Sequence, residues 1–235
     1  MPASAWSAPR RSAIRSRSSS TAASSRCARP MPAPSSSAMT DRPFRVAVLG
    51  NPNAGKSTLF NALTGLSQKV GNYPGVTVER KAGVVQRLAR PIELIDLPGT
   101  YSLAAHSPDE MVAVDLLLGQ IPGEPRPDAI LAVIDASNLE RNLYLVSQLQ
   151  ETGLPLLIAL NMVDVAAARG IRIDREQLAT RLGAPIVATR ADRGDGLDRL
   201  RAELDALAVA RTPAAPPPAP VEPAALAAGI EALVA

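Results

Sequence analysis

The chain has 235 residues, of which 46% are hydrophobic and 20% are charged, so it carries enough apolar material for one domain with a substantial core. Its single Cys excludes an internal disulfide framework and argues against a Cys-based zinc site, and no apolar run approaches the roughly 18 residues that a transmembrane helix needs. Six Arg and no acidic residue lie in residues 1–38, which leaves 19 basic against 22 acidic residues in the rest of the chain and argues against nucleic acid as a partner.

Residues 1–38 form a segment rich in Ser, Ala, Pro and Arg, with twelve Ser and no hydrophobic periodicity, for which we predict disorder. A mitochondrial transit peptide has a similar composition, so that alternative stays open. We favour a start of translation at Met39, with the upstream residues as read-through, because the preference for Arg over Lys fits a GC-rich genome. Cys27 falls in this segment and is expected to be an unpaired bystander.

From Phe44 onward, apolar runs alternate with amphipathic stretches. Buried strands are predicted at 44–49, 92–97, 129–134, 155–160 and 185–188, and residues 84–88 are predicted to form a hairpin with 91–95. Helices are predicted at 57–64, 107–118, 139–150, 174–182 and 197–207. The alternation favours an α/β fold with a mostly parallel sheet of about six strands, covered by helices on both faces. An Ala/Pro linker is expected at 208–223 and the start of a further helical segment at 224–235.

The segment from Gly50 to Ser57 matches the pattern G-x-x-x-x-G-K-[ST] and stands between a predicted strand and a predicted helix. Glycine is needed there because backbone N–H groups must wrap around phosphates, and a Cβ would obstruct that approach. Lys56 supplies a mobile positive charge for the β- and γ-phosphates, and the Ser57 hydroxyl is a ligand for Mg²⁺. In this context the motif predicts a phosphate-binding loop.

A second short motif, Asp-Leu-Pro-Gly at 96–99, comes after the predicted strand at 92–95. A carboxylate at the end of a strand can hold a Mg²⁺-bound water, and Gly99 lets a backbone N–H turn toward a γ-phosphate. The motif alone also makes ordinary turns, so its weight comes from its place downstream of a phosphate-binding loop.

A candidate base site lies at the end of the strand predicted at 155–160, where Asn161 and Asp164 stand three residues apart. A carboxylate can accept both N–H donors on one edge of guanine, and the Asn amide can reach the other edge. Adenine would leave that carboxylate unpaired, and sites of this kind reject the wrong base by ~10⁴. Met162 can lay its unbranched side chain over the base, where most guanine sites have Lys.

Taken together, these motifs resemble the N-terminal cytosolic G domain of the ferrous iron transport protein B (FeoB) family, and the resemblance implies a P-loop GTPase fold. It runs from about residue 44 to residue 207. The blocks that carry it are GNPNAGKSTLFNAL (50–63), VGNYPGVTVERK (70–81), DLPGTYS (96–102), DASNLERNLYL (135–145) and ALNMVD (159–164). The phosphate-binding loop is general to P-loop GTPases, whereas the blocks at 70–81 and 135–145 are close to diagnostic of the family.

The resemblance also implies residue roles. Thr77 matches the switch I threonine that joins Ser57 and Asp96 at Mg²⁺, and Asp96 and Gly99 form the switch II pair. Asn53 matches the asparagine that seats K⁺ against the phosphates in K⁺-activated GTPases, where the cation takes the place of an arginine finger. The implied catalytic residues are Asn53, Lys56, Thr77 and Gly99. The implied GTP-binding residues are Gly50, Asn51, Pro52, Asn53, Ala54, Gly55, Lys56, Ser57, Thr58, Gly75, Val76, Thr77, Val78, Glu79, Asp96, Leu97, Pro98, Gly99, Asn161, Met162, Asp164, Thr189, Arg190 and Ala191.

Two departures from the family pattern stand out. The base-contacting loop reads Ala-Thr-Arg-Ala at 188–191, so Arg190 replaces a small hydroxyl residue, while the backbone N–H of Ala191 is still expected to reach guanine O6. Tyr73 stands where Trp is common. After Gly99, Thr100 and Tyr101 provide no Gln to position an attacking water, which the family shares and which predicts slow turnover.

Other residues have simpler interpretations. His106, the only histidine, is expected in a solvated loop. The acidic pair at 109–110 is expected to favour the dipole at a helix start, and residues 79–81 are expected to be an exposed strand entry. Tyr101 and Tyr144 are expected to be packing residues.

The resemblance therefore implies a Mg²⁺-dependent, K⁺-stimulated GTPase with a slow intrinsic rate, which binds GTP and GDP and regulates Fe²⁺ uptake through its own membrane-spanning permease domain, absent from this sequence. Small accessory Feo proteins are further expected partners. The full protein is expected in the bacterial inner membrane with this domain in the cytoplasm, and this chain alone is expected to be a soluble, cytoplasmic fragment or truncated product.

Two alternatives stay open. One is a ribosome-assembly GTPase, which would need an RNA-binding module that the acidic balance of residues 39–235 does not support. The other is a nucleotide-gated switch with negligible hydrolysis. Potassium-dependent turnover would separate that switch from an enzyme.

Overall fold

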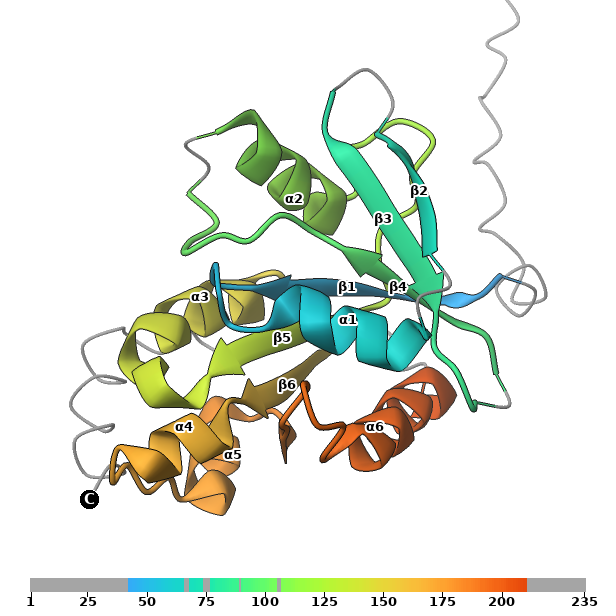
Figure 1. Cartoon of the computed structure of the whole chain (residues 1–235). Helices are drawn as coiled ribbons and strands as arrows, with labels where there is room; N and C mark the ends of the chain where they lie inside the picture. Colours follow the sequence, from blue (N-terminus) through green and yellow to red (C-terminus); the bar gives the residue numbers. More distant parts are fainter. Residues whose placement is uncertain (1–41, 66–67, 74–76, 89, 105–106, 211–235) are drawn as a thin grey trace, which may run out of the picture. The chain divides into compact units, whose positions relative to one another are not determined.

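The computed structural model describes residues 42–65, 68–73, 77–88, 90–104 and 107–210. The strands in these ranges are β1 (Phe44–Gly50), β2 (Gln68–Asn72), β3 (Glu79–Val84), β4 (Ile92–Asp96), β5 (Ala129–Asp135), β6 (Leu156–Asn161) and β7 (Ile186–Ala188). They form one sheet of seven strands in the order β2-β3-β4-β1-β5-β6-β7 (Figure 1). Strands β4, β1, β5, β6 and β7 pair in parallel, whereas β3 is antiparallel to both β4 and β2.

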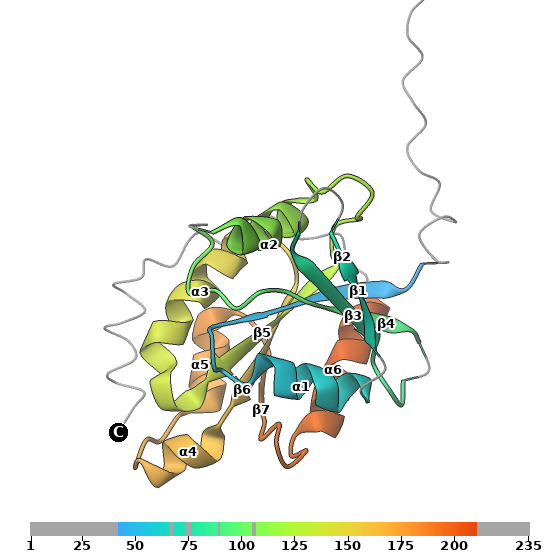
Figure 2. The ribbon, with the colours of Figure 1, turned by 45° about the horizontal axis from the view of Figure 1, so that its top comes forward.

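Helices cover both faces of this sheet. The described helices are α1 (Lys56–Thr64), α2 (Pro108–Leu118), α3 (Leu139–Glu151), α4 (Val163–Ala168), α5 (Arg175–Leu182) and α6 (Leu197–Ala210), and the 3₁₀ turn η2 (Ala136–Asn138) precedes α3. Helices α1 and α6 pack on one face, and α2, α3 and α5 pack on the other (Figure 2). Strand β1 is buried along its whole length because Val46 and Val48 join the α1–α6 layer while Ala47 and Leu49 join the opposite layer.

The structure confirms the predicted α/β fold and corrects its details. The sheet has one strand more than the approximate number predicted because β2 (QKVGN) adds an edge strand whose side chains are almost all exposed, so no buried apolar face marks it in the sequence. The predicted hairpin exists, but its first strand is β3 at 79–84 and not 84–88. Helix α6 runs on through 208–210, into the predicted linker, because Ala208 is buried against the core. The tail at 1–38, the remaining linker at 211–223 and the segment at 224–235 lie outside the described residues.

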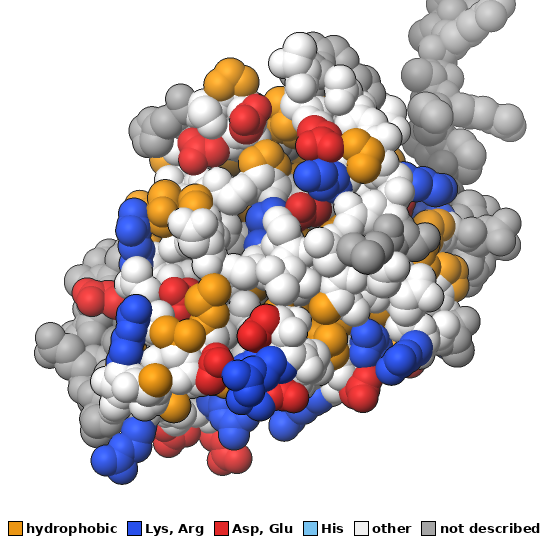
Figure 3. All heavy atoms as spheres, in the orientation of Figure 1, with side chains coloured by type: hydrophobic (Ala, Val, Ile, Leu, Met, Phe, Trp, Pro, Cys, Tyr) orange, Lys and Arg blue, Asp and Glu red, His pale blue; other side chains and the backbone are white. Residues whose placement is uncertain are grey.

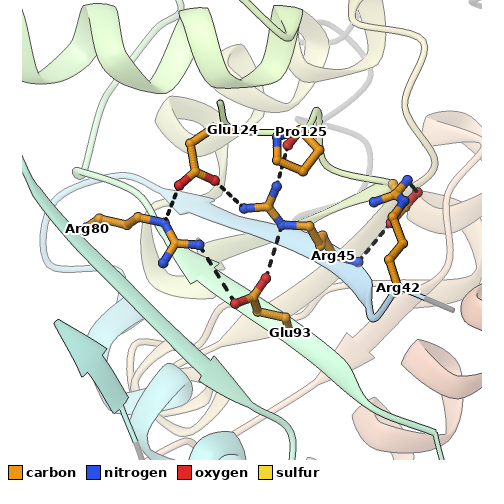
Figure 4. Close-up of polar contacts among 7 residues, drawn as sticks. Arg42, Arg45, Arg80, Glu93, Glu124 and Pro125 are labelled. Carbon is orange, nitrogen blue, oxygen red and sulfur yellow. Dashed lines mark hydrogen bonds and ion pairs between the residues drawn. The ribbon is translucent and has the colours of Figure 1, made fainter. Parts of the chain in front are cut away.

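Four charged side chains link three strands and one loop, and we call them the charged cluster (Figure 4). Arg45 of β1 lies 3.1 Å (Nε) from Glu93 Oε2 and 2.6 Å (Nη2) from Glu124 Oε2. Arg80 of β3 lies 3.0 Å (Nε) from Glu124 Oε1 and 3.8 Å (Nη2) from Glu93 Oε1. Two positive and two negative charges thus balance within a ring that ties antiparallel β3 to β1 and to the loop before β5.

The charged cluster corrects the prediction that residues 79–81 are an exposed strand entry. Glu79 is exposed, but Arg80 and Lys81 are partly buried. Arg80 reaches into the ring between Glu93 and Glu124, and an isolated sequence pattern cannot show partners that lie on another strand and in a distant loop.

Tyr73 is another polar group in this region, buried with only 1% of its surface exposed. Its backbone N–H donates to the Val78 carbonyl at 3.1 Å, whereas its hydroxyl oxygen has no hydrogen-bond partner in the part of the chain that the structure describes. Burial raises the pKa of the Tyr73 phenol to about 12, because the ionised form would lose its hydration there.

The raised pKa of Tyr73 predicts an alkaline loss of stability. The unfolded chain releases the Tyr73 proton near pH 10 and the folded chain only near pH 12, so between these values the folded state binds more protons and the free energy of unfolding falls as the pH rises. The slope from this group is about 1.4 kcal/mol per pH unit. Urea unfolding of the wild type and of Tyr73→Phe from pH 8 to pH 12 gives the free energy of unfolding of each as a function of pH. The difference between the two pH profiles is the contribution of Tyr73, and parallel profiles would contradict the raised pKa of Tyr73.

Candidate functional site

The loop that joins β1 to α1 has a backbone that requires glycine at two positions. A Cβ on Gly50 would lie 2.3 Å from the Val133 carbonyl oxygen, and a Cβ on Gly55 would lie 2.2 Å from Asn161 Nδ2. Asn53 and Gly55 both have positive φ angles, 68° and 85°. Such alternation of backbone handedness turns successive N–H groups toward one side, which forms a concavity for an anion.

A cavity of about 340 Å³ lies beside this loop and brings together segments that are distant in the sequence. The Nζ of Lys56, at the start of α1, donates a hydrogen bond to Asp96 Oδ1 at the end of β4, and both side chains are largely buried. The predicted site residues that line the cavity are Lys56, Ser57, Thr77, Val78, Glu79, Asp96, Leu97 and Pro98. The phosphate-binding loop, the start of α1 and the two predicted switch segments therefore meet at one place.

Two further residues line this cavity although the sequence patterns place neither in a site. Lys81 of β3 forms an ion pair with Glu79 at 3.4 Å, and Asp109 lies in the first turn of α2. Alternation along β3 from Thr77 would have pointed to Lys81, because residues 77, 79 and 81 share one face of an extended segment. Of the remaining predicted residues, Gly75 and Val76 lie outside the described residues, as does His106.

Gly99 lies against the phosphate-binding loop. A Cβ on Gly99 would be 3.4 Å from the backbone N and Cα of Pro52, and the next residue, Thr100, donates its N–H to the Gly50 carbonyl at 3.2 Å. Two residues before Gly99, Leu97 donates its N–H to the Val48 carbonyl at 3.1 Å. The segment after β4 therefore continues along the end of β1 and lies beside the phosphate-binding loop.

On the other side of the loop, Asn161 ties three segments together. Its Nδ2 donates to the Ala54 carbonyl at 3.0 Å, and its Oδ1 accepts from the Ala191 N–H at 3.1 Å and from Thr189 Oγ1 at 3.3 Å. The sequence predicts both the Asn161 amide and the Ala191 N–H at the base, but here they bond to each other. Because its carbonyl oxygen is already used twice, the geometry suits Asn161 to positioning the loops around a base.

Two neighbours of Asn161 complete the candidate base site. Met162 has a φ of 60°, and its Cε would lie 3.7 Å from a Cβ placed on Gly55, so the side chain extends over the phosphate-binding loop. Asp164, in the first turn of α4, is partly exposed, so its carboxylate is accessible to a ligand.

Arg190, the departure noted in the base-contacting loop, has a partner within that loop. Its Nη2 donates to the Asp195 carboxylate, and its backbone N–H donates to the Asp195 carbonyl at 3.1 Å. Gly196 closes the turn, because a Cβ there would lie 2.1 Å from the Ala188 carbonyl oxygen. Arg190 thus bonds within the loop that contains it, and its two bonds to Asp195 hold the two ends of that loop together.

The prediction that Tyr101 and Tyr144 are packing residues is wrong. Their exposed fractions are 40% and 47%, and both make polar contacts. The guanidinium carbon of Arg141 lies 3.9 Å from the centroid of the Tyr101 ring, and the Tyr144 hydroxyl accepts a hydrogen bond from Gln148 Nε2 at 3.3 Å. The aromatic rings are therefore used for their faces and polar edges more than for burial.

The cavity offers oxygen groups of the kind that Mg²⁺ binds. The hydroxyls of Ser57 and Thr77 and the carboxylate of Asp96 are hard donors, so the residues present fit Mg²⁺. Asn53, which lines a neighbouring cavity of about 190 Å³ together with Asn51, Pro52 and Ala54, contributes an amide oxygen, a donor type that fits K⁺. Within the described ranges, no group of three or more His, Cys, Asp or Glu side chains forms a metal cluster.

The surface and the helices add two observations. In the view of Figure 3, acidic and basic side chains lie interspersed over the lower part of the molecule. None of the helices in the described part of the chain is long and apolar enough to cross a bilayer.

Comparisons of the sequence with known proteins show what the chain is similar to. A family model described as "Ferrous iron transport protein B" matches residues 44–204. The Fe(2+) transporter FeoB of Salmonella typhi is 48% identical over 164 residues, which cover 68% of this chain and 21% of the relative, and that of Shigella flexneri is 47% identical over the same length with the same coverage. The chain thus spans about a fifth of the length of the curated relatives that it matches.

Solved structures of FeoB domains have a fold similar to that of this chain. A mutant of S. thermophilus NFeoB bound to mGDP has a TM-score of 0.64 at 50% identity, covering 68% of this chain and 60% of that one. The G domain of T. maritima FeoB has a TM-score of 0.63 at 42% identity, covering 71% of this chain and 99% of that one.

Proposed function

The chain belongs to the ferrous iron transport protein B family, and from this premise we propose that it binds GTP and hydrolyses it to GDP and phosphate as the nucleotide-responsive domain of a ferrous iron uptake protein. The observation that carries the proposal is the cavity in which Lys56, Ser57, Thr77 and Asp96 come together from distant parts of the sequence. An ordinary glycine turn that happened to contain Lys and Ser would not be expected to lie beside both a threonine and a carboxylate from two other segments of the chain.

In this proposal the phosphates lie against the loop between β1 and α1. Backbone N–H groups of residues 51–57 donate to phosphate oxygens, and the N-terminus of α1 favours the negative charge. When GTP binds, Lys56 would leave Asp96 for the β- and γ-phosphates, and the Asp96 carboxylate would then be available as one of the residues that hold Mg²⁺. The backbone N–H of Gly99 donates a hydrogen bond to the terminal phosphate, which only GTP carries.

The base lies between Met162, Asp164 and the loop at 189–191. The Asp164 carboxylate accepts the two N–H groups on one edge of guanine, while Asn161 holds the surrounding loops in place. Arg190, through its pair with Asp195, keeps the base-contacting loop closed and does not obstruct the base.

Two cations have a place in the proposal. Ser57, Thr77 and Asp96 are the residues that would hold Mg²⁺, which when bound neutralises charge on the phosphate oxygens. Asn53 is the residue that would contribute to a K⁺ site, and K⁺ there supplies positive charge where the reaction develops negative charge. Thr100 and Tyr101 come directly after Gly99, so no glutamine at these positions orients a water, and a slow intrinsic rate is expected.

The biological role rests on the family. We infer that nucleotide binding regulates Fe²⁺ transport by a permease domain of the same protein in the bacterial inner membrane, with this domain on the cytoplasmic side and small Feo proteins as accessory partners. In this arrangement residues 39–207, extended by α6 to residue 210, form the G domain. The remaining linker at 211–223 and the segment at 224–235 connect it toward the permease domain.

The experiment that tests the proposal is phosphate release from GTP in KCl and in NaCl at equal ionic strength, with Mg²⁺ present. We expect release in KCl to be at least about tenfold faster, because a seated cation stabilises charge in the transition state. Asn53→Gly should abolish the stimulation while GDP still binds, since glycine removes the amide and tolerates the φ of 68° at this position. Asn53→Ala, which removes the same amide but opposes that φ, shows how much strain contributes.

Equal rates in the two salts would contradict potassium activation. If GTP binds with negligible release in both salts, the alternative of a nucleotide-gated switch is favoured. If GTP does not bind at all, the proposed function is wrong.

A further inference from the structure

Helix α3 holds the segment after Gly99 through side chains on one of its faces. Arg141 places its guanidinium carbon 3.9 Å from the centroid of the Tyr101 ring, and Gln148 Oε1 accepts the Leu103 N–H at 2.7 Å. Gln148 Nε2 in turn donates to the Tyr144 hydroxyl at 3.3 Å, which orients the amide so that its oxygen faces Leu103. We call Arg141, Tyr144 and Gln148 the α3 latch.

The spacing of the three residues of the α3 latch places their side chains on one face of α3. Steps of three and four residues place 141, 144 and 148 on the same face of a helix, one turn above the other. Two of them belong to the block at 135–145, which resembles the family closely but contributes no residue to the cavity around Lys56.

The segment held by the α3 latch also contacts the phosphate-binding loop. Thr100 donates its N–H to the Gly50 carbonyl at 3.2 Å, and Gly99 packs on Pro52. A cavity of about 190 Å³ lies between the two, with Asn51 and Asn53 among its lining residues from the loop and Tyr101 and Arg141 from the latch contact. The latch therefore acts on the residues immediately after the predicted γ-phosphate contact.

We propose that Arg141 and Gln148 are positioning residues that keep residues 100–103 against the phosphate-binding loop, so that the Gly99 N–H is presented to the terminal phosphate of GTP. This inference rests on the proposed function, because it assigns the Gly99 N–H to that phosphate. GDP lacks the terminal phosphate, so the α3 latch contributes to binding of GTP and not of GDP.

The first test needs no nucleotide. Amide exchange measured by NMR on the nucleotide-free full chain should show faster exchange at Leu103 in Gln148→Ala, by about two- to tenfold, because one hydrogen bond is lost. Arg141→Met should raise amide exchange at Thr100 because the whole segment moves away from Gly50. Thr100 bonds to Gly50, Ser102 and Glu110 and not to Arg141, so this effect would reach it only through the segment. Arg175→Met, the same change of charge at the exposed start of α5, serves as the matched control.

The second test separates positioning from general stabilisation. In Arg141→Met, affinity for a non-hydrolysable GTP analogue should fall about two- to fivefold, which is the size of an exposed cation–π contact, while GDP affinity stays unchanged. Tyr101→Leu should give the same loss, and Tyr101→Phe should keep most of the affinity because the ring face remains. The double variant Arg141→Met/Tyr101→Leu should lose no more than either single variant.

Each result decides a distinct question. Unchanged exchange at Thr100 and Leu103 would overturn the α3 latch whatever the nucleotide does. Equal losses for GDP and the GTP analogue would show that Arg141 only stabilises the fold. A wild-type chain that binds neither nucleotide would reject the proposed function, while the exchange measurement would still report whether the latch holds the segment.

Discussion

Asp164→Ala is expected to lower the affinity of the chain for GTP and GDP by about two to four powers of ten. The carboxylate is proposed to accept two N–H groups of guanine, and each hydrogen bond to a charged group contributes about 1.5–3 kcal/mol. Removing it leaves two donors of the base without a partner in the site. Titration with a fluorescent GDP analogue, for the wild type and the variant, measures the difference directly.

Two companion variants sharpen this prediction. Asp164→Asn keeps the shape of the side chain but offers an N–H donor, so it should weaken guanine binding and favour xanthine, which presents an acceptor at that edge. Asp192→Ala removes an exposed carboxylate from the neighbouring base-contacting loop and should leave the affinity unchanged. If Asp164→Ala binds GDP as tightly as the wild type, Asp164 does not contact the base.

Arg45→Met is expected to lower the free energy of unfolding by about 3–5 kcal/mol, the usual cost of breaking a buried ion pair by removing one partner. The Arg45 side chain is only 5% exposed, and besides Glu93 and Glu124 its Nη1 donates to the Pro125 carbonyl at 2.6 Å. Methionine fills part of the volume but leaves both carboxylates with one guanidinium between them. Urea unfolding at neutral pH measures the loss.

The matched control for Arg45 is Arg42, three residues earlier in the chain. Arg42 forms an ion pair of 2.5 Å with Asp128 but is about one-third exposed, so Arg42→Met should cost less than about 1 kcal/mol. Adding Glu124→Gln to Arg45→Met should restore part of the loss, because it removes one uncompensated charge. Equal effects of the two arginine variants would show that the charged cluster behaves as an ordinary surface network.

The parallel part of the fold is predictable from sequence because burial on both faces produces continuous apolar runs. Strands β1, β5 and β6 are apolar along nearly their whole length, and each is recognisable from that run. Strand β2 is not, because an exposed edge strand needs no apolar pattern. Arg45 stands inside buried β1 and fits there only because Glu93 and Glu124, 48 and 79 residues away, complete its charge.

The candidate site also has a part that the sequence predicts and a part that it does not. The phosphate-binding loop is predictable because its glycines are required by the local backbone conformation. Gly55, for example, has a φ of 85°. The contact of Arg190 with Asp195 and the three bonds of Asn161 are not, since a sequence shows which side chains can bond but not which of them meet. The α3 latch lies beyond sequence reasoning for the same reason: Arg141 and Tyr101 are brought together by the sheet, not by their spacing.

The sharpest single test of GTPase function is phosphate release from GTP and from ATP by the full chain, in Mg²⁺ and KCl, beside the variant Lys56→Met. We predict release from GTP alone, and its loss in the variant because the mobile charge of Lys56 at the β- and γ-phosphates is gone. Hydrolysis of ATP at the same rate as GTP, or a Lys56→Met chain that turns over GTP like the wild type, would contradict the proposed function.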